Sequence, residues 1–312
     1  MEHEKPLVSL ITYCFNGERF LKTYFEALLA QTYTNLELFF FNNGSIDATG
    51  EIAESYRPLL EKKFSRVSIE HYERNQPTAA LKTKALLQLK GKYFLGVDSD
   101  DIMTADHVEK MIDYLENHPE TDLVFCQLQS LNENTGKHTG IIKIEPRKTA
   151  KEHFLDCLFS RNMIYTPISY MVRTEGFLKA NHSMKIFETR YGENYQILLP
   201  LLYYKKPGFI QEPLGEYLVR SDSYTANLAN YEKKITAFEA QDVTIHNTLM
   251  QMQIPDAEKY DRLSRKRLYG DCLHLAIASG NREKMKEQFQ KAKKVGALNP
   301  KLYIKYLLAH LK

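Results

Sequence analysis

Apolar and polar positions alternate in a regular order along the first hundred residues. Short apolar runs rich in β-branched and aromatic residues predict strands, and apolar residues spaced three or four apart predict helices. The predicted strands are 8–12, 36–41, 67–72 and 93–97, and the predicted helices between them are 18–31, 48–60 and 78–89. Strand and helix in alternation at these lengths predict parallel strands joined by right-handed crossovers, which is a layered α/β fold.

The pattern changes twice further along the chain. A helix over 106–117 and a strand over 123–128 continue the alternation, and 130–225 mixes short strands with helices near 150–159 and after Gly192. From about Asn230 onward the chain is expected to be wholly helical, with helices over 262–278, 282–294 and 300–310. We therefore predict an α/β domain followed by an all-helical extension, with a boundary at 225–230.

Three of the first four predicted strands end in polar residues. These clusters are Tyr13 to Asn16, Asn42 to Ser45, and Asp98 to Asp101, and Asp47 is predicted to cap the helix that follows the second. Because ligands of parallel sheets bind beyond the carboxyl ends of the strands, the three clusters predict one shared site.

The acidic segment Gly96-Val-Asp-Ser-Asp-Asp101 is the sharpest chemical signal. Two carboxylates two positions apart after a strand can both face one divalent cation, and Mg²⁺ and Mn²⁺ prefer such oxygen ligands. The alternative is that Asp100 or Asp101 only caps the helix that follows. The position at the end of a strand in an alternating unit favours the metal site.

Three segments together resemble family 2 glycosyltransferases. They are TYCFNGERFL with QTY at the end of its helix, the strand ending in FNNGSID, and GKYFLGVDSDD. The resemblance is continuous over about 100 residues and extends more weakly to about residue 225. It implies a GT-A fold, which is a Rossmann-like mixed sheet flanked by helices, over 1–225. This domain would consist of a nucleotide-binding half, 1–101, and an acceptor half, 102–225. A C-terminal helical region, 226–312, would follow it. It also implies inverting transfer of a sugar from a nucleotide diphosphate donor, usually UDP-linked, to an acceptor hydroxyl, with Mn²⁺ or Mg²⁺ at Asp98 and Asp100.

The resemblance also implies a set of donor-binding residues. They are Thr12, Tyr13, Asn16, Asn42, Asn43, Ser45, Lys82, Asp98 and Arg220. Asn42 and Asn43 depart from the family, which usually has two Asp there, the first of which meets the uracil ring. An Asn oxygen can still accept a hydrogen bond from the base, but without charge assistance, so selectivity for uridine is expected to weaken. Lys82 stands where the family often has Arg; it keeps the charge and loses the bidentate fork.

The catalytic base of the family is usually the Asp of a Glu-Asp pair at the start of a helix. The corresponding residues are Glu193 and Asn194, so Glu193 is the predicted base and Asn194 is predicted to position the acceptor. The alternative for Glu193 is a first-turn acid that complements the helix dipole. Asp222 stands where the family has a His that can ligate metal, and it is a candidate third metal ligand or an exposed turn residue.

There are two alternatives to an active glycosyltransferase. The Asn residues at family acid positions could mark a degenerate homologue that binds donor, does not turn it over, and acts as a partner subunit. A sugar nucleotidyltransferase would need a Gly-rich basic phosphate-binding opening, which TYCFNGERF does not supply.

Composition and charge narrow the class of protein further. Apolar residues are 43% and charged residues 26% of the 312, as in ordinary globular proteins, and no apolar run reaches the roughly 20 residues of a membrane span. The four cysteines have no CxxC spacing, which favours reduced thiols in a cytoplasmic protein. The net charge of +3 does not predict nucleic-acid binding.

The positive charge is concentrated at the C-terminal end of the chain. Residues 231–312 contain 16 Lys and Arg against 9 Asp and Glu. This excess predicts either a solvated helical face or contact with an anionic partner, such as the inner face of a membrane. The expected acceptor is a glycan, a lipid-linked molecule or a protein.

Overall fold

The structure is a computed structural model that describes residues 5–182, 185–189, 191–220 and 230–310. Contacts between Cα atoms divide the chain into two compact units, Met1–Arg220 and Ser221–Lys312. The predicted boundary at 225 lies outside the described residues and stays a prediction.

The first unit has a mixed sheet with helices on both faces. Its strands are β1 (Val8–Cys14), β2 (Leu36–Asn42), β3 (Arg66–His71), β4 (Tyr93–Gly96), β5 (Ile102–Met103), β6 (Leu123–Asn132), β7 (Lys137–Ile142), β8 (Tyr170–Arg173) and β9 (Gly208–Val219). Its helices are α1 (Glu18–Ala30), α2 (Thr49–Lys63), α3 (Thr78–Gln88), α4 (His107–Asn117), α5 (Ala150–Leu158), the 3₁₀ turn η1 (Pro167–Ser169), α6 (Thr174–Asn181) and α7 (Tyr195–Tyr204). The strands and helices predicted in the first 130 residues are confirmed, with bounds that differ by a few residues.

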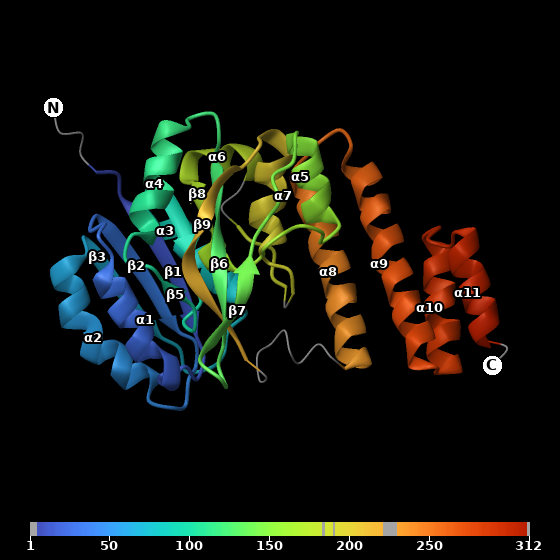
Figure 1. Ribbon diagram of the computed structural model, residues 1–312, viewed down its shortest axis with the longest axis horizontal. Helices are drawn as coiled ribbons and strands as arrows, with labels where there is room; N and C mark the ends of the chain where they lie inside the picture. Colours follow the sequence, from blue (N-terminus) through green and yellow to red (C-terminus); the bar gives the residue numbers. More distant parts are fainter. Residues whose placement is uncertain (1–4, 183–184, 190, 221–229, 311–312) are drawn as a thin grey trace. The chain divides into compact units, whose positions relative to one another are not determined.

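The strand order decides where a ligand can bind. The sheet runs β3-β2-β1-β4-β8-β6-β9-β5, with β7 paired to β6, and its first four strands are parallel (Figure 1). The chain moves outward from β1 through β2 to β3 and then returns to place β4 on the other side of β1. The strand order therefore reverses between β1 and β4, and such a switch point is where α/β sheets bind ligands.

The sheet core is built from the apolar runs that predicted the strands. Every residue of β2 is buried, and α1 buries Leu21, Tyr24, Phe25 and Leu28 against the sheet. The buried residues of β2 include a carboxylate, because Glu37 is only 1% exposed. Its Oε1 accepts hydrogen bonds from Ser9 Oγ and from the Lys90 and Gly91 backbone N–H groups. These donors replace water around the buried charge and connect β1, β2 and the turn before β4.

The second unit is helical. It consists of α8 (Tyr231–Gln251), α9 (Ala257–Ser279), α10 (Arg282–Lys294) and α11 (Pro300–His310). Its core contains Leu273, Ala276, Met285, Ala292, Leu302 and Tyr306. The expectation of a helical chain from about residue 230 is confirmed, and the helix predicted from 262 begins at Ala257.

Three further features concern a helix cap, the cysteines and the helix lengths. The predicted cap residue Asp47 is wrong by one position, since the N-cap of α2 is Ala48, although Asp47 Oδ1 still accepts from the Thr49 N–H at 3.0 Å. All four cysteines are buried and unpaired by disulfides. A search of the described helices for one long and apolar enough to cross a bilayer finds none.

Candidate active site

The loops after β1 and β2 are joined by hydrogen bonds. Asn16, at φ 52°, donates its N–H to Ser45 Oγ at 2.9 Å, and its Oδ1 accepts from the Ile46 N–H at 3.0 Å. Gly17 N–H donates to Thr49 Oγ1 at 2.8 Å. The structure thus brings together Asn16 and Ser45, which both stand in the predicted donor set, and it fixes the carboxyl edge of two adjacent strands.

Asn42 is held by a chain of polar groups that sequence reasoning missed. Its Nδ2 lies 3.0 Å from His71 Nδ1 on β3, and His71 Nε2 lies 2.8 Å from Glu54 Oε1 on α2. A carboxylate can only accept, so His71 carries its proton on Nε2 and accepts from Asn42 at Nδ1. The amide nitrogen of Asn42 therefore faces His71, and its amide oxygen faces the turn. This oxygen, Oδ1, accepts a hydrogen bond from the Ser45 N–H at 3.3 Å.

The side chain of Asn43 connects the loop after β2 to the segment before α3. It is 2% exposed, and its amide exchanges two hydrogen bonds with the backbone of Gln76, at 2.9 and 2.7 Å. An Asp could accept from the Gln76 N–H but could not donate to its carbonyl. Thr12 is also turned inward, because its hydroxyl is fully buried and hydrogen-bonded to Tyr24 OH. Their proposed contacts with the nucleoside stay predictions.

The acidic turn follows β4 at the switch point of the sheet. Asp98 and Asp100 are partly buried, and Asp101 is only 3% exposed. Arg220, just after β9, places a guanidinium N 2.8 Å from Asp100 Oδ2. Asp101 Oδ2 accepts from Thr166 Oγ1 at 3.3 Å, and burial followed by the charges of Asp98 and Asp100 raises the pKa of Asp101 well above its usual range. The structure therefore places Asp98, Asp100 and Arg220 together, and their roles in donor and metal binding stay predictions.

A second cluster joins α3 to the start of α7. Lys82 is 5% exposed, and its Nζ donates to Glu193 Oε1 at 2.8 Å and to Asn194 Oδ1 at 3.0 Å. Thr78 Oγ1 donates to Glu193 Oε2 at 2.6 Å. Although burial opposes it, the Lys82 charge with these hydrogen bonds lowers the pKa of Glu193. Three residues predicted for two different roles therefore form one hydrogen-bonded group.

Asn194 is fixed on both sides of its amide. Besides Lys82, Tyr170 OH donates to Oδ1 at 3.0 Å, and Nδ2 donates to the Tyr165 carbonyl at 2.7 Å. Thr78 and Tyr170 were not predicted. A polar residue directly after Pro77 at the start of a helix was the only signal for Thr78, and nothing in the sequence pointed to Tyr170.

Electrostatic coupling shows that the acidic turn and the Lys82 cluster belong to one site. The pKa of Asp98 is raised to about 7, first by burial and then by the charges of Asp100 and Glu193, while Lys82 and Arg220 oppose the rise. The pKa of Tyr13 is raised by burial and by Glu193 and Asp98, and its buried OH has no hydrogen-bond partner among the described residues. Tyr13, Lys82, Asp98 and Tyr170 all line one small cavity.

The donor set of the acidic turn fits a hard divalent cation. Asp98 and Asp100 offer carboxylate oxygens, and burial followed by the charges of Asp100 and Glu193 raises the pKa of Asp98 although Lys82 and Arg220 oppose the rise. Over the residues that the structure describes, no group of three or more His, Cys, Asp or Glu has metal-binding geometry. Asp222, the candidate third ligand, lies outside those residues.

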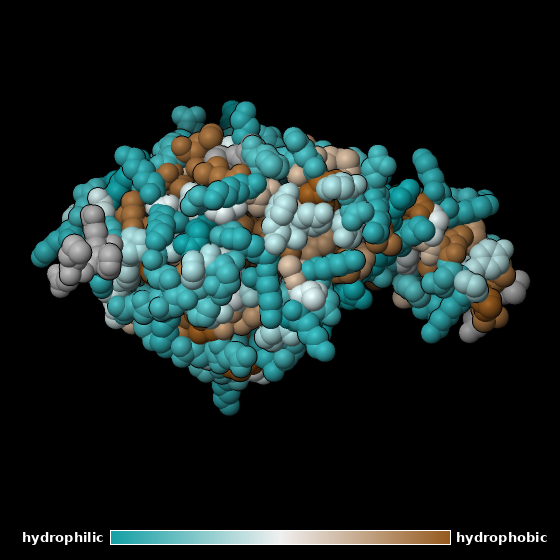
Figure 2. Space-filling view, turned by 90° about the horizontal axis from the view of Figure 1, so that it is seen from above, coloured by the Kyte–Doolittle hydropathy of each residue, from teal (hydrophilic) through white to brown (hydrophobic). Residues whose placement is uncertain are grey.

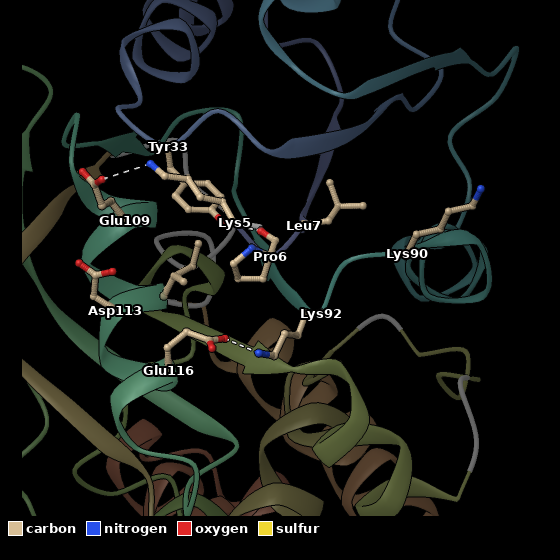
Figure 3. Close-up of a pocket in the computed structure, with 10 residues that line it drawn as sticks. Lys5, Pro6, Leu7, Tyr33, Lys90, Lys92, Glu109, Asp113 and Glu116 are labelled. Atoms are coloured by element: carbon tan, nitrogen blue, oxygen red, sulfur yellow. Dashed lines mark hydrogen bonds and ion pairs between the residues drawn. The ribbon is translucent and has the colours of Figure 1, made fainter. Parts of the chain in front are cut away.

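A larger hollow lies at the opposite edge of the sheet, near the amino ends of β1 and β4. It has a volume of about 620 Å³, and its lining includes Lys5, Tyr33, Lys92, Glu109 and Glu116 (Figure 3). Lys5 pairs with Glu109 at 3.9 Å and Lys92 with Glu116 at 2.5 Å. Two of its three lysines are thus paired with carboxylates, and none of the predicted site residues lines it.

Comparison with known proteins identifies the class that this fold and site define. The sequence profile of glycosyl transferase family 2 matches residues 9–178, more than half of the chain. The chain therefore belongs to glycosyl transferase family 2; it has the GT-A fold and is a glycosyltransferase. The resemblance and the fold expected from the sequence are confirmed.

Three similar proteins illustrate the match. The putative glycosyltransferase EpsH of Bacillus subtilis is 35% identical over half of this chain and 44% of its own length, so the chain spans about half of that relative. The processive diacylglycerol beta-glycosyltransferase of Mycoplasma genitalium is 24% identical over 93% of this chain and 86% of its own. The crystal structure of S. aureus TarS 1–349 in complex with UDP-GlcNAc has a TM-score of 0.59 at 15% identity, covering 92% of this chain and 90% of its own, which shows a shared fold.

Proposed function

We propose that the protein is a metal-dependent, inverting glycosyltransferase that moves a sugar from a UDP-sugar to an acceptor hydroxyl in cell-surface glycan synthesis. The observation that carries the proposal is the convergence of Asp98, Asp100, Lys82 and Glu193 at the switch point of the sheet. The fold shared with TarS, which was crystallised with UDP-GlcNAc, supports a nucleotide-sugar donor.

Asp98 and Asp100 would hold Mn²⁺ or Mg²⁺, with Asp222 as a third candidate ligand. The bound cation would neutralise the charge of the donor diphosphate. The Arg220 guanidinium, 2.8 Å from Asp100, orients that carboxylate, and it adds a second positive charge at the diphosphate end of the site.

Glu193 accepts the proton of the attacking hydroxyl. The oxygen of the acceptor forms a bond to the anomeric carbon from the face opposite the nucleotide, the bond to the diphosphate oxygen breaks, and the diphosphate leaves with the electron pair. Glu193 is ionised at neutral pH because its pKa is lowered, so it is in the state that can take the proton. Thr78 and Lys82 each hold one of its oxygens, and Asn194 positions Lys82.

The nucleoside side of the site is formed by the loops after β1 and β2. The Asn42 amide, oriented by His71 and Glu54, presents its oxygen to the base as a neutral acceptor. Thr12, Tyr13, Asn16, Asn43 and Ser45 complete this side. Among the acceptors considered, the match along nearly the whole chain to a diacylglycerol glycosyltransferase supports a lipid-linked one.

A second candidate function is donor binding without turnover, as in a partner subunit. The observation that favours it is that Lys82, Glu193 and Asn194 satisfy one another, so each group the reaction needs already has a partner. The two functions make different predictions for the same variants.

The test combines nucleotide binding with turnover. Calorimetry should show that Mn²⁺ strengthens UDP binding to the native chain, and that Asp98→Asn abolishes the Mn²⁺-dependent part. Glu175→Gln, an exposed change on α6, is the matched control and should bind like the native protein. Release of UDP from a panel of UDP-sugars should be abolished in Glu193→Gln while UDP binding is kept.

Two outcomes would decide against parts of the proposal. Unchanged metal-dependent binding in Asp98→Asn would remove the metal site. Metal-dependent binding with no turnover of any donor by the native chain, given lipid, glycan and protein acceptors, would favour the second candidate.

A further inference from the structure

Helix α11 has two apolar faces, of which one is buried in its own unit and the other is largely exposed among the described residues. Leu302 and Tyr306 are buried in the core of the helical unit, with Ala309 packed beside them. On the opposite side, Tyr303, Ile304, Leu307 and Leu308 are 45, 55, 41 and 60% exposed. Residues three or four positions apart lie on the same face of a helix, so the spacings Tyr303–Leu307, Ile304–Leu307 and Ile304–Leu308 join these four side chains into one continuous strip, which we call the α11 strip.

The α11 strip is bordered by positive charge. Lys301 and Lys305 lie along one side of it on the same helix, and α11 contains no acidic residue. Arg282, Lys286 and Lys293 share one exposed face of α10, and Phe289 of that helix stacks on Tyr306 and contacts Tyr303. For Arg282, Lys286, Lys293 and Lys301 the described residues provide no ion pair.

A hollow continues the strip toward the start of α10. It has a volume of about 550 Å³ and is lined by Ile277, Gly280, Arg282, Met285, Lys305 and Leu308, with Ala309. Apolar walls with two cations at the rim can take both parts of a phospholipid, the acyl chain and the anionic headgroup. Figure 2 shows hydrophobic surface of the helical unit exposed among hydrophilic atoms.

In α9 and at the end of α10, three basic residues form ion pairs inside the unit. Arg265 pairs with the buried Asp242 and Asp261, at 3.1 and 3.3 Å. Arg267 pairs with Asp271, and Lys291 with Glu239 and Glu287. Their charge is compensated within the fold, whereas the described residues provide no ion pair for Arg262 and Lys266 on α9 or for the cations beside the α11 strip. The cations beside α11 differ from those on α9 because an exposed apolar strip of four residues runs next to them.

We propose that the α11 strip docks the protein on an anionic lipid bilayer. An interfacial helix places its apolar side chains among the acyl chains and its basic side chains at the headgroups, which is the pattern of Ile304 and Leu308 flanked by Lys301 and Lys305. A second copy fits this face poorly, because a two-fold contact would bring the same cations of both copies together. This inference is independent of the donor and metal proposed above.

The experiment is flotation of the full chain with vesicles of phosphatidylcholine alone or with about one third phosphatidylglycerol. Binding to the anionic vesicles should exceed binding to the neutral ones at least tenfold at low salt and should fall steeply as salt rises. The double variant Ile304→Ser with Leu308→Ser should lose this binding, and Lys301→Glu with Lys305→Glu should lose it as well.

The matched controls are Leu263→Ser and Arg262→Glu on α9. Leu263 is 39% exposed, so it tests an exposed apolar residue away from the strip. Both controls should bind vesicles like the native chain. Circular dichroism and UDP binding show that every variant is folded, and retained UDP binding also separates this result from a failure of the proposed function.

Three outcomes would overturn the proposal. The first is equal or negligible binding to both vesicle types at low salt. The second is an equal loss in the α9 controls. The third is self-association in sedimentation equilibrium that the double Ser variant removes while no variant, native chain included, binds vesicles, which would assign the strip to a second copy.

Discussion

The Lys82 ammonium lies 2.8 Å from a Glu193 carboxylate oxygen across 111 positions of sequence. Lys82 comes from α3 and Glu193 from the segment before α7, so the ion pair connects the nucleotide-binding part of the first unit to the part expected to bind the acceptor. Both side chains are largely buried, at 6% and 21% exposure. Neither charge can be removed without leaving the other in a site that water reaches poorly.

Removing the Lys82 charge should therefore destabilise the protein. Lys82→Met is expected to lower the free energy of unfolding by about 3 kcal/mol, the scale of breaking a buried ion pair from one side. Urea unfolding followed by circular dichroism measures it. The exposed Lys179, paired with Glu175 on α6, is the control, and Lys179→Met should leave the urea midpoint close to that of the native protein.

The same ion pair predicts a pH dependence. The pKa of Glu193 is lower in the folded state than the ordinary value near 4.3 of an unfolded chain, so its contribution to stability is complete above that value. The contribution is lost as the pH falls through the lowered pKa. Glu193→Gln should flatten the stability profile below about pH 5, in a comparison of urea midpoints from pH 3 to 7. An unchanged slope would mean that the ion pair does not form in solution.

Asp98 should behave in the opposite sense. Its folded pKa of about 7 lies above the ordinary value near 3.9, so in the ligand-free protein this group costs stability as the pH rises from about 4 to 7. Asp98→Asn should thus stabilise the ligand-free protein at pH 8 while it abolishes Mn²⁺-dependent UDP binding. Thermal unfolding at pH 5 and 8 checks the sign. A variant less stable than native at pH 8 would contradict the assigned environment.

Asn42 provides a prediction about how the base is read. Asn42→Ala should weaken UDP binding by about 0.5–1.5 kcal/mol, the scale of one neutral hydrogen bond. Asn42→Asp replaces the amide that donates to His71 Nδ1 with a group that can only accept, so this hydrogen bond should be lost. The NMR signals of the His71 ring should therefore differ between Asn42→Asp and the native protein. Identical ring signals would contradict the proposed orientation of the amide.

Gly44 lies in the loop after β2, and Gly136, in the turn between β6 and β7, is its matched control. Both have left-handed backbone, at φ 79° and 62°, but a Cβ at Gly44 would lie 2.4 Å from the Asn75 backbone, whereas the space around Gly136 is open. Gly136→Ala should cost about 1 kcal/mol of stability from backbone strain alone. Gly44→Ala should cost clearly more and should also weaken UDP binding, because the Asn43 loop must shift. Equal losses of stability in both variants would show that the Asn75 backbone moves away from the added Cβ at no cost in free energy.

Periodicity and local chemistry in the sequence determined the alternating strands and helices, the helical C-terminal region, the acidic turn and the family. These are properties of neighbouring residues: apolar spacing decides which face is buried, and strand ends that share a direction meet at one edge. The positions of Asn16, Ser45, Asp98 and Asp100 followed from this rule. The predicted cap residue, Asp47, was wrong by one position, because the identity of a cap depends on the exact residue at which the helix begins.

Only the tertiary structure decided which distant groups meet. Lys82 pairs with Glu193 and Asn194, Arg220 with Asp100, and Asn42 with His71, and no periodicity relates these positions. The same holds for charge: the sequence counted the cations of the C-terminal region, but only the packing of the helices neutralised Arg265 and Lys291 and left Lys301 beside an exposed apolar strip. Composition determines how many charges a segment carries, whereas the net field at its surface depends on which of them the fold brings within a few ångströms of an opposite charge.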